Sequence, residues 1–241
     1  MGENSESVFS KIYREKIWGS GSEMNPLSGK GSNPDFAKPY VDFIRNLISS
    51  KKILSVLDLG HGDWVMWRDY KFDDTFYLGL DVADDLSNMN TLKFGNEKRV
   101  FKKVSSDAIL PSAELLICKD VLQHLSLREI DKILSQFNKF RYVVLCNDIR
   151  ISIKLTKKIR YYLQIRTRLR SLKQLKFPFY IAKFPYNNSD INSGGHRGLD
   201  FEAYPFAPMI LKDFKIVKKI DFNSEHSDGT KKRILFFENL G

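Results

Sequence analysis

Five segments with the length and pattern of strands occur between residues 53 and 148, separated by stretches that can hold crossover connections. They are ILSVLDL (53–59), FYLGLDV (76–82), RVFKKV (99–104), AELLICKDV (113–121) and YVVLCND (142–148). Two later segments, FKIVKKIDF (214–222) and RILFFENL (233–240), flank the polar loop NSEHSDGTKK, which is typical of an antiparallel hairpin. The pattern predicts an α/β fold with a Rossmann-like, doubly wound sheet that is mostly parallel and has an antiparallel C-terminal hairpin.

Two further segments have the spacing of amphipathic helices. Apolar residues recur at helical intervals over residues 36–50 and again over 125–140, where Ser126 is a candidate N-cap. Residues 1–35 are polar and glycine-rich, and the stretch 18–34 has the turn chemistry of a loop. No internal repeat interrupts the pattern, so we expect residues 1–241 to form a single domain.

The positive charge of the chain is concentrated in one segment. The net charge is +10, and residues 150–176 contain ten Lys or Arg and no Asp or Glu. Apolar residues recur at helical intervals among these charges, which predicts a helix with one cationic face. That face is interpreted as solvated, as a surface for anionic lipid or a phosphorylated sugar-lipid, or as a phosphate-tracking face for nucleic acid. Few aromatic residues accompany the charges, so nucleic acid is the less favoured partner.

Cysteine usage and hydropathy bear on the compartment. Cys118 and Cys146 lie in apolar runs, which predicts buried thiols rather than a disulfide or a zinc site. No apolar run approaches the roughly 18 residues of a membrane span, and the N-terminus lacks the layout of a signal peptide. We therefore expect a cytoplasmic protein that is not transmembrane, with peripheral attachment to a membrane surface as an alternative.

Polar residues follow four of the predicted strands. Because the carboxyl ends of parallel strands meet at one edge of a sheet, where ligands bind, we expect these residues to converge. Glycines let the chain turn tightly and let a ligand approach backbone N–H groups, and an acidic residue about 20 positions later is suited to ribose hydroxyls. The four groups are Asp58 with Gly60 and Gly62, then Asp81, then Ser106 with Asp107, and finally Lys119 with Asp120.

These residues lie in motifs that resemble a known family. VLDLGHGDW (56–64), YLGLDV (77–82), SSDA (105–108) and LLICKDVLQHLS (115–126) are similar, in this order, to the motifs of class I S-adenosylmethionine-dependent methyltransferases. The resemblance covers about residues 40–148 and implies a seven-stranded sheet, S-adenosylmethionine as cofactor and S-adenosylhomocysteine as product. An NAD fingerprint is disfavoured, because Val65 stands where its third glycine would be.

The resemblance also implies a set of cofactor-binding residues. Family members commonly have a small residue or Cys at the position of His61, and the backbone path depends on the flanking glycines, so we expect the His61 ring to be a bystander. The segment from Trp18 to Ser32 is interpreted as a lid over the methionine end of the cofactor, with a flexible leader as the alternative. The implied cofactor residues are Asp58, Gly60, His61, Gly62, Asp81, Val82, Ser106, Asp107, Lys119, Trp18, Ser28, Gly29 and Ser32.

A narrower resemblance concerns the acceptor. IYREKIWG (12–19), SGKGSNP (28–34) and DINSGGHRGLDFEAYPF (190–206) are similar to segments of methyltransferases of bacteria and large DNA viruses, several linked to sugar or glycan modification. It implies O-methylation of a saccharide or related hydroxyl-bearing molecule, in the host cytoplasm if the source is viral. The alternatives are a methyltransferase acting on RNA or protein, and a binding module without turnover that holds an anionic partner. Residues 150–210 are the expected substrate-recognition insertion.

Methyl transfer to a hydroxyl is an in-line displacement that benefits from a general base. The candidates are His124, Asp120 and His196, and local packing is the alternative role for His124. Candidate substrate residues are Arg197, Asp148 and Gln123. A weaker alternative places Mg²⁺ between Asp120 and Asp148, although each Asp is also suited to capping a following helix.

Overall fold

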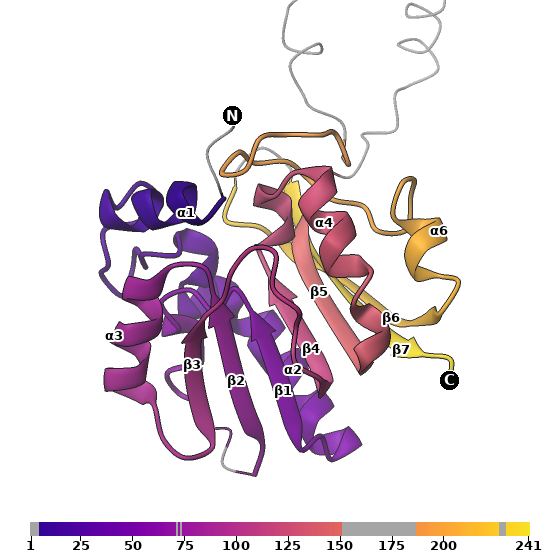
Figure 1. The fold of residues 1–241 in the computed structure, drawn as a ribbon, viewed down its shortest axis with the longest axis horizontal. Coiled ribbons are helices and arrows are strands. Elements are labelled where there is room, and N and C mark those ends of the chain that lie inside the picture. The colour runs from indigo at the N-terminus through magenta and orange to yellow at the C-terminus, as the bar shows by residue number, and fades with distance from the viewer. Residues whose placement is uncertain (1–4, 71, 73, 151–186, 227–229) are drawn as a thin grey trace, which may run out of the picture.

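The computed structural model describes residues 5–70, 72, 74–150, 187–226 and 230–241. Beyond Arg150, the basic helix expected over 150–176 lies outside the described residues. Within them, seven strands form one sheet in the order β3-β2-β1-β4-β5-β7-β6 (Figure 1). The strands are β1 (Ser55–Leu59), β2 (Phe76–Asp81), β3 (Arg99–Lys103), β4 (Ala113–Lys119), β5 (Phe140–Arg150), β6 (Phe214–Asn223) and β7 (Thr230–Asn239).

Strand directions confirm the predicted fold class. The pairs β1·β2, β2·β3, β1·β4 and β4·β5 are parallel, whereas β7 runs antiparallel to both β5 and β6. Because β7 is antiparallel, its first residues lie beside the last residues of β5, with Lys232 opposite Asp148. The C-terminal hairpin thus brings its turn to the edge where the parallel strands end.

Two of the helices begin at residues whose side chains cap them. In α2 (Pro34–Lys51), the Asn33 side chain accepts a hydrogen bond from the backbone N–H of Asp35. In α4 (Leu127–Leu134), Ser126 and Glu129 form a capping box, which confirms Ser126 as the N-cap. This helix is shorter than the expected span of 125–140, and a 3₁₀ turn, η4 (Phe137–Lys139), follows it. The remaining elements are α1 (Ser5–Arg14), η1 (Lys30–Ser32), η2 (Val65–Trp67), α3 (Asp84–Phe94), η3 (Leu122–His124) and α6 (Ala207–Ile210).

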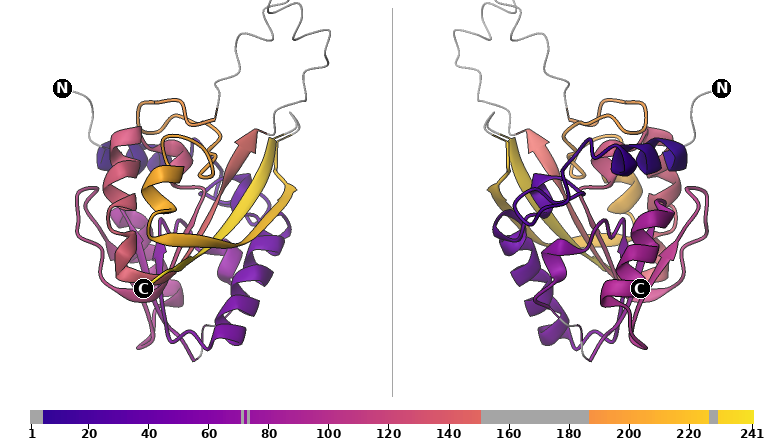
Figure 2. Two further views of the ribbon diagram at one scale, coloured as in Figure 1. Left: turned by 90° about the vertical axis from the view of Figure 1, so that its right-hand side faces the viewer. Right: turned by 90° about the vertical axis from the view of Figure 1, so that its left-hand side faces the viewer.

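Each face of the sheet has its own apolar core. On one face, α4 and α6 pack against the central strands, with Ile130, Leu134 and Ile210 buried among them. On the other face, α2 and η2 bury Tyr40, Ile44 and Trp67. Figure 2 shows α2 and α4 on opposite sides of the sheet. The sheet is therefore covered on both faces, and a ligand can reach it at the carboxyl ends of its parallel strands.

The N-terminal segment differs from the sequence prediction. Residues 5–14, part of the expected polar leader, form the helix α1, which lies beyond the carboxyl ends of the strands (Figure 1). Phe9 and Ile12 are buried on one side of α1 and join the apolar core of the α4 face. A few apolar residues at helical spacing are enough to form a helix in this polar stretch, because packing against the core stabilises short helices.

Both thiols are buried and unpaired, as predicted for Cys118 and Cys146. No helix in the described part of the chain has the length and apolar character that crossing a membrane requires.

A buried carboxyl in β1 makes stability depend on pH. Asp58 is 1% exposed and accepts hydrogen bonds from Tyr77 Oη at 2.6 Å and Trp67 Nε1 at 3.2 Å. Burial raises the pKa of Asp58 to about 6, because these hydrogen bonds only partly replace the lost hydration. The unfolded chain has an ordinary carboxyl with a pKa near ~4, so the folded protein binds more protons between pH 4 and 6.

We expect the stability that Asp58 contributes to fall as the pH rises through this window. The loss amounts to about 3 kcal/mol, the equivalent of a shift of about two pKa units. Denaturant unfolding at several pH values from 4 to 7 measures it, and the variant Asp58→Asn is expected to lack this part of the pH dependence. Identical pH profiles of the two proteins would contradict the prediction.

Candidate functional site

A cavity of about 410 Å³ opens at the carboxyl edge of the parallel strands. Its volume lies in the range of roughly 300 to 1,000 Å³ that small-molecule and cofactor sites occupy. Most of the residues expected to bind the cofactor line it. They are Gly60, His61, Gly62, Asp81, Val82, Ser106, Asp107, Lys119, Trp18, Ser28 and Ser32. Asp58 and Gly29 do not line it, because Asp58 is held inside the sheet and Gly29 precedes η1 beside Trp18.

The turn after β1 depends on its two glycines. Gly60 and Gly62 have φ of +79° and +56°, which L-residues with side chains rarely adopt. A Cβ on Gly60 would lie 2.2 Å from Val121 Cγ2, and one on Gly62 would lie 2.2 Å from Ser28 Oγ. The backbone therefore passes close to both neighbours, and residues 60–62 of the turn line the cavity.

The buried His61 ring stabilises this turn through hydrogen bonds and packing. It is 2% exposed, its Nδ1–H donates to the carbonyl of Gly62 at 2.8 Å, and its Nε2 lies 3.2 Å from Ser87 Oγ. The ring also packs edge-on against Phe101. Its hydrogen-bonding groups are used within the protein, which supports the expectation that His61 is no catalyst.

Asp81, at the end of β2, is oriented by the backbone. Its two carboxylate oxygens accept hydrogen bonds from the N–H groups of Gly62, at 3.0 Å, and Ala83, at 2.9 Å. Each oxygen retains a lone pair for a further donor. The carboxylate therefore lies at the cavity wall with lone pairs for further donors, and binding of ribose hydroxyls stays a prediction.

The expected lid is attached to the cavity by hydrogen bonds. Ser28 Oγ accepts from the N–H of Asp63 at 2.8 Å, and Asp63 Oδ2 in turn accepts from the N–H of Ser28 at 3.3 Å. Lys119 Nζ donates to the carbonyl of Gly31 at 2.8 Å. The segment is thus bonded to the turn after β1 and to the end of β4, and its role as a lid stays a prediction.

Ser106 and Asp107 line the end of the cavity away from the Trp18–Ser32 segment. Asp107 forms an ion pair with Lys132 of α4, which lowers the pKa of the Asp107 carboxyl. The backbone N–H of Ser106 donates to Glu6 of α1 at 3.3 Å. Both predicted residues thus lie at the wall, next to contacts from α1 and α4 that are not evident in the sequence.

His124 has the geometry of a general base. Its Nδ1–H donates to the carbonyl of Gly195 at 2.7 Å, so in the neutral ring Nε2 carries the lone pair. Burial lowers the pKa of His124 to about 4, and the hydrogen bond to Gly195 opposes this shift only in part. The ring lines the cavity and stacks on Trp18 with centroids 4.7 Å apart. At neutral pH an unprotonated imidazole therefore lies at the cavity wall.

Asp120 is a less suitable base. It adopts a left-handed conformation after β4, with φ of +58°. Its Oδ2 lies 2.5 Å from Lys119 Nζ and its Oδ1 lies 2.6 Å from Lys232 Nζ. Burial by itself would raise the pKa of Asp120, but the two ammonium groups outweigh this effect and hold it well below the usual range. A carboxylate so stabilised in its charged form has little tendency to accept a proton.

The predicted Mg²⁺ alternative between Asp120 and Asp148 is corrected by the structure. The ammonium group of Lys232 lies between these carboxylates, 2.6 Å from Asp120 Oδ1 and 3.0 Å from Asp148 Oδ1. Its positive charge takes the place that a cation would need. The sequence analysis did not identify Lys232 because it enters the site from the antiparallel strand β7.

Gln123 and Arg197, expected to contact substrate, are used inside the protein and do not line the cavity. Gln123 Oε1 accepts from the N–H of Asp148 at 2.7 Å, and the Arg197 guanidinium donates to the carbonyl of Leu125 at 2.7 Å. Arg197 is fully buried, and burial lowers its pKa to about 10. Direct substrate contact by Arg197 is thus contradicted. It holds the loop at 195–199 against the backbone of Gln123 and Leu125, which follow β4.

That loop places His196 near His124. Their ring centroids lie 5.5 Å apart, although His196 does not itself line the cavity. His196 Nε2 donates to Asp148 Oδ2 at 2.8 Å. Asp148, expected to contact substrate, is fully buried, and it is therefore oriented toward His196 and Lys232 rather than toward the cavity.

Sequence reasoning missed two groups of residues at this edge. Phe9 and Tyr13 of α1 line the cavity and pack around Trp18, with Tyr13 edge-on at 5.6 Å between centroids. Glu225 and His226 lie in the β6–β7 turn, next to Lys232 and Asp148 respectively. The predicted antiparallel hairpin was the signal in the sequence, because an antiparallel last strand brings the β6–β7 turn to the carboxyl ends of the parallel strands.

No family model and no curated protein sequence matches this chain. Solved structures match its fold. The N-methyltransferase NodS from Bradyrhizobium japonicum WM9, in complex with S-adenosyl-L-homocysteine, has a TM-score of 0.62 at 10% identity, covering 99% of this chain and 100% of that chain. The magnesium protoporphyrin IX methyltransferase ChlM from Synechocystis PCC 6803, with bound SAH, has a TM-score of 0.57 at 14% identity, covering 96% and 94%.

A SAM-dependent methyltransferase from Anabaena variabilis ATCC 29413 has a TM-score of 0.59 at 12% identity, covering 98% of this chain and 96% of that chain. At these identities the likeness concerns the fold. This chain has the seven-stranded α/β fold of SAM-dependent methyltransferases, as the motif resemblance implied.

Proposed function

We propose that this protein is an S-adenosylmethionine-dependent methyltransferase that transfers the methyl group to a hydroxyl of a saccharide or related small molecule. One observation carries the proposal. A single cavity contains the glycine turn, the Asp81 carboxylate and an imidazole, His124, whose Nε2 is unprotonated. The motif resemblance and the neighbours that bind S-adenosylhomocysteine support the same cofactor.

The residues present fit this cofactor. Gly60 and Gly62 let the turn pack against Val121 and Ser28, and the turn itself lines the cavity. The Asp81 carboxylate is suited to ribose hydroxyls, and the lid from Trp18 to Ser32 covers the end toward His124. Together these groups would hold the nucleoside and the methionine end of one molecule in the same cavity.

When bound, S-adenosylmethionine supplies a methyl group that its positively charged sulfur activates toward displacement. The glycine turn and Asp81 would hold this cofactor, and the methyl group would pass to the acceptor oxygen with release of S-adenosylhomocysteine. The hydroxyl proton would pass to Nε2 of His124; the carbonyl of Gly195 favours the resulting imidazolium, and burial opposes it. Trp18, stacked on the imidazole, shields it from water. The residues thus align the reactants and accept one proton.

The acceptor class and the compartment are parts of the proposal. The basic stretch from Arg150 to Lys176 is suited to an anionic group on the acceptor, such as a phosphorylated or lipid-linked sugar. The buried, unpaired thiols of Cys118 and Cys146 are compatible with a reducing, cytoplasm-like compartment.

Methyl transfer with radiolabelled S-adenosylmethionine tests this function. We expect label to enter neutral or phosphorylated saccharides, and calorimetry to show binding of S-adenosylhomocysteine. Label entering only RNA or protein would overturn the acceptor class. Cofactor binding without transfer to any acceptor would indicate a binding module, and absence of cofactor binding would overturn the function altogether.

A further inference from the structure

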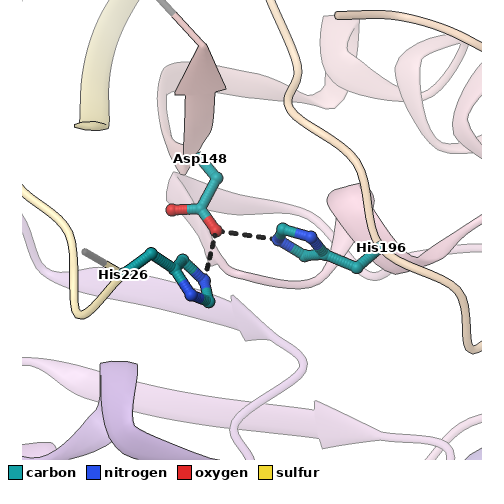
Figure 3. Close-up of side chains that lie close together, drawn as sticks. All are labelled: Asp148, His196 and His226. Atoms are coloured by element: carbon teal, nitrogen blue, oxygen red, sulfur yellow. Dashed lines mark hydrogen bonds and ion pairs between the residues drawn. The ribbon is translucent and has the colours of Figure 1, made fainter. Parts of the chain in front are cut away.

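Three potential metal ligands converge at the carboxyl edge of the sheet, beside the cavity. Asp148 comes from the end of β5, His196 from the loop before α6, and His226 from the β6–β7 turn (Figure 3). Asp148 Oδ2 lies 2.8 Å from His196 Nε2 and 3.3 Å from His226 Nε2. Segments distant in sequence thus direct two imidazoles at the same carboxylate oxygen.

The separations suit one small cation. Metal–ligand bonds of about 2.0–2.2 Å in a tetrahedral site place neighbouring ligand atoms about 3.3 Å apart. All three ligand atoms lie within 4.8 Å of one another. Because the side chains of His196 and His226 are 37% and 42% exposed, small rotations of these rings would admit an ion between them and the carboxylate.

We propose that Asp148, His196 and His226 bind one divalent transition-metal ion such as Zn²⁺. Two imidazole nitrogens and one carboxylate oxygen form a ligand set that favours such ions over Mg²⁺ and Ca²⁺, which prefer oxygen ligands. The site differs from the Mg²⁺ alternative between Asp120 and Asp148, since it uses Oδ2 of Asp148, whereas Lys232 lies 3.0 Å from Oδ1.

The carboxylate ligand is held in place by its neighbours. Asp148 is fully buried; its N–H donates to Gln123 Oε1 at 2.7 Å, and its Oδ1 faces Lys232 at 3.0 Å. Lys232 also lies near Asp120 and Glu225, at 2.6 and 3.3 Å. Its charge is therefore shared among three carboxylates, and Oδ2 of Asp148 is left to face the two histidines. Such supporting contacts commonly orient metal ligands.

The exposure of the two histidines leaves coordination positions that face outward, as catalytic sites with three protein ligands do. The ring of His196 is 5.5 Å from the ring of His124, which lines the cavity. An oxygen of the acceptor bound to the ion would therefore lie close to the base. This second step, that the ion positions the acceptor hydroxyl, rests on the proposed function, whereas the metal site does not.

Titration of the full chain with Zn²⁺, followed by calorimetry, tests the site directly. We expect one ion per chain, with affinity reduced at least tenfold in His196→Ala and in His226→Ala. His124→Ala is the matched control, because it removes a neighbouring histidine outside the ligand set and is expected to retain binding. The buried thiols of Cys118 and Cys146, whose pKa values burial raises far above the usual value, do not compete as ligands.

Two results would overturn the metal site. One is unchanged Zn²⁺ affinity in both histidine variants, and the other is Mg²⁺ binding as tight as that of Zn²⁺. Co²⁺ provides a second readout, since its visible absorption is expected to change when His226 is replaced by alanine. Neither measurement requires methyl transfer, so failure of the proposed function leaves the result on the site intact.

The positioning step is tested separately by removing the metal with a chelator. We expect the KM for the acceptor to rise at least tenfold, while the affinity for S-adenosylhomocysteine remains unchanged and Zn²⁺ restores the original KM. An unchanged KM after verified metal removal would overturn the positioning role. Absence of transfer by the metal-loaded protein with every acceptor would instead count against the proposed function.

Discussion

Replacing His124 with alanine is expected to lower kcat for methyl transfer by about 10² to 10⁴-fold, the usual contribution of a general base. The proton-accepting nitrogen of His124 is Nε2, because Nδ1–H is bonded to the carbonyl of Gly195. The affinity for S-adenosylhomocysteine, measured by calorimetry, is expected to change by less than about threefold, since cofactor binding depends on other residues.

His124→Gln separates chemistry from packing. A glutamine amide can still donate to the carbonyl of Gly195, but it offers no nitrogen that accepts a proton. We therefore expect His124→Gln to be as slow as His124→Ala while its thermal unfolding stays close to that of the unchanged protein. Activity of His124→Gln near the original level would rule out the assigned role.

Asp81→Asn is expected to weaken S-adenosylhomocysteine binding by about 10 to 100-fold, the equivalent of one or two charge-assisted hydrogen bonds. Asp81 accepts from the N–H groups of Gly62 and Ala83. An asparagine would direct its NH₂ group at one of these donors, and it would also have fewer lone pairs for ribose hydroxyls. The turn and the ligand contact would both be weakened.

Asp84→Asn is the matched control for this measurement. Asp84 is an exposed carboxylate in the first turn of α3, three residues from Asp81, and does not line the cavity. We expect its replacement to leave the affinity within about twofold of the original. Equal weakening in both variants would show that the effect is one of net charge, and unchanged affinity in Asp81→Asn would remove Asp81 from the site.

Local patterns were sufficient to predict most of the sheet. Strands such as ILSVLDL and YVVLCND are continuous apolar runs, as expected when both faces of a strand are covered, and they correspond to β1 and β5. The glycine turn and Asp81 were also predictable, because their roles depend on backbone conformation and short sequence spacing. The helix α1 was not predicted, because its few apolar residues lie in a polar stretch and their packing against the core is evident only in the folded structure.

Outside the glycine turn, the local sequence pattern did not predict the contacts of several side chains. Arg197 follows two glycines in a polar loop, which suggested an exposed substrate contact, yet its guanidinium is buried against backbone carbonyls. The sequence suggested a metal cation between Asp120 and Asp148, but the ammonium group of Lys232 lies between these carboxylates. In both cases the partner lies more than 70 residues away in sequence, so the sequence alone could not identify it.

By itself, the sequence determined the fold class, the turn after β1 and the set of strand ends that form the cavity, because these follow from hydrophobic periodicity and from glycine conformation. The tertiary structure alone decided which nitrogen of His124 is available as a base, how Lys232 neutralises Asp120, and that His196 and His226 face one oxygen of Asp148. These properties depend on contacts between strands, loops and turns far apart in the chain. No local pattern specifies such contacts before the chain has folded.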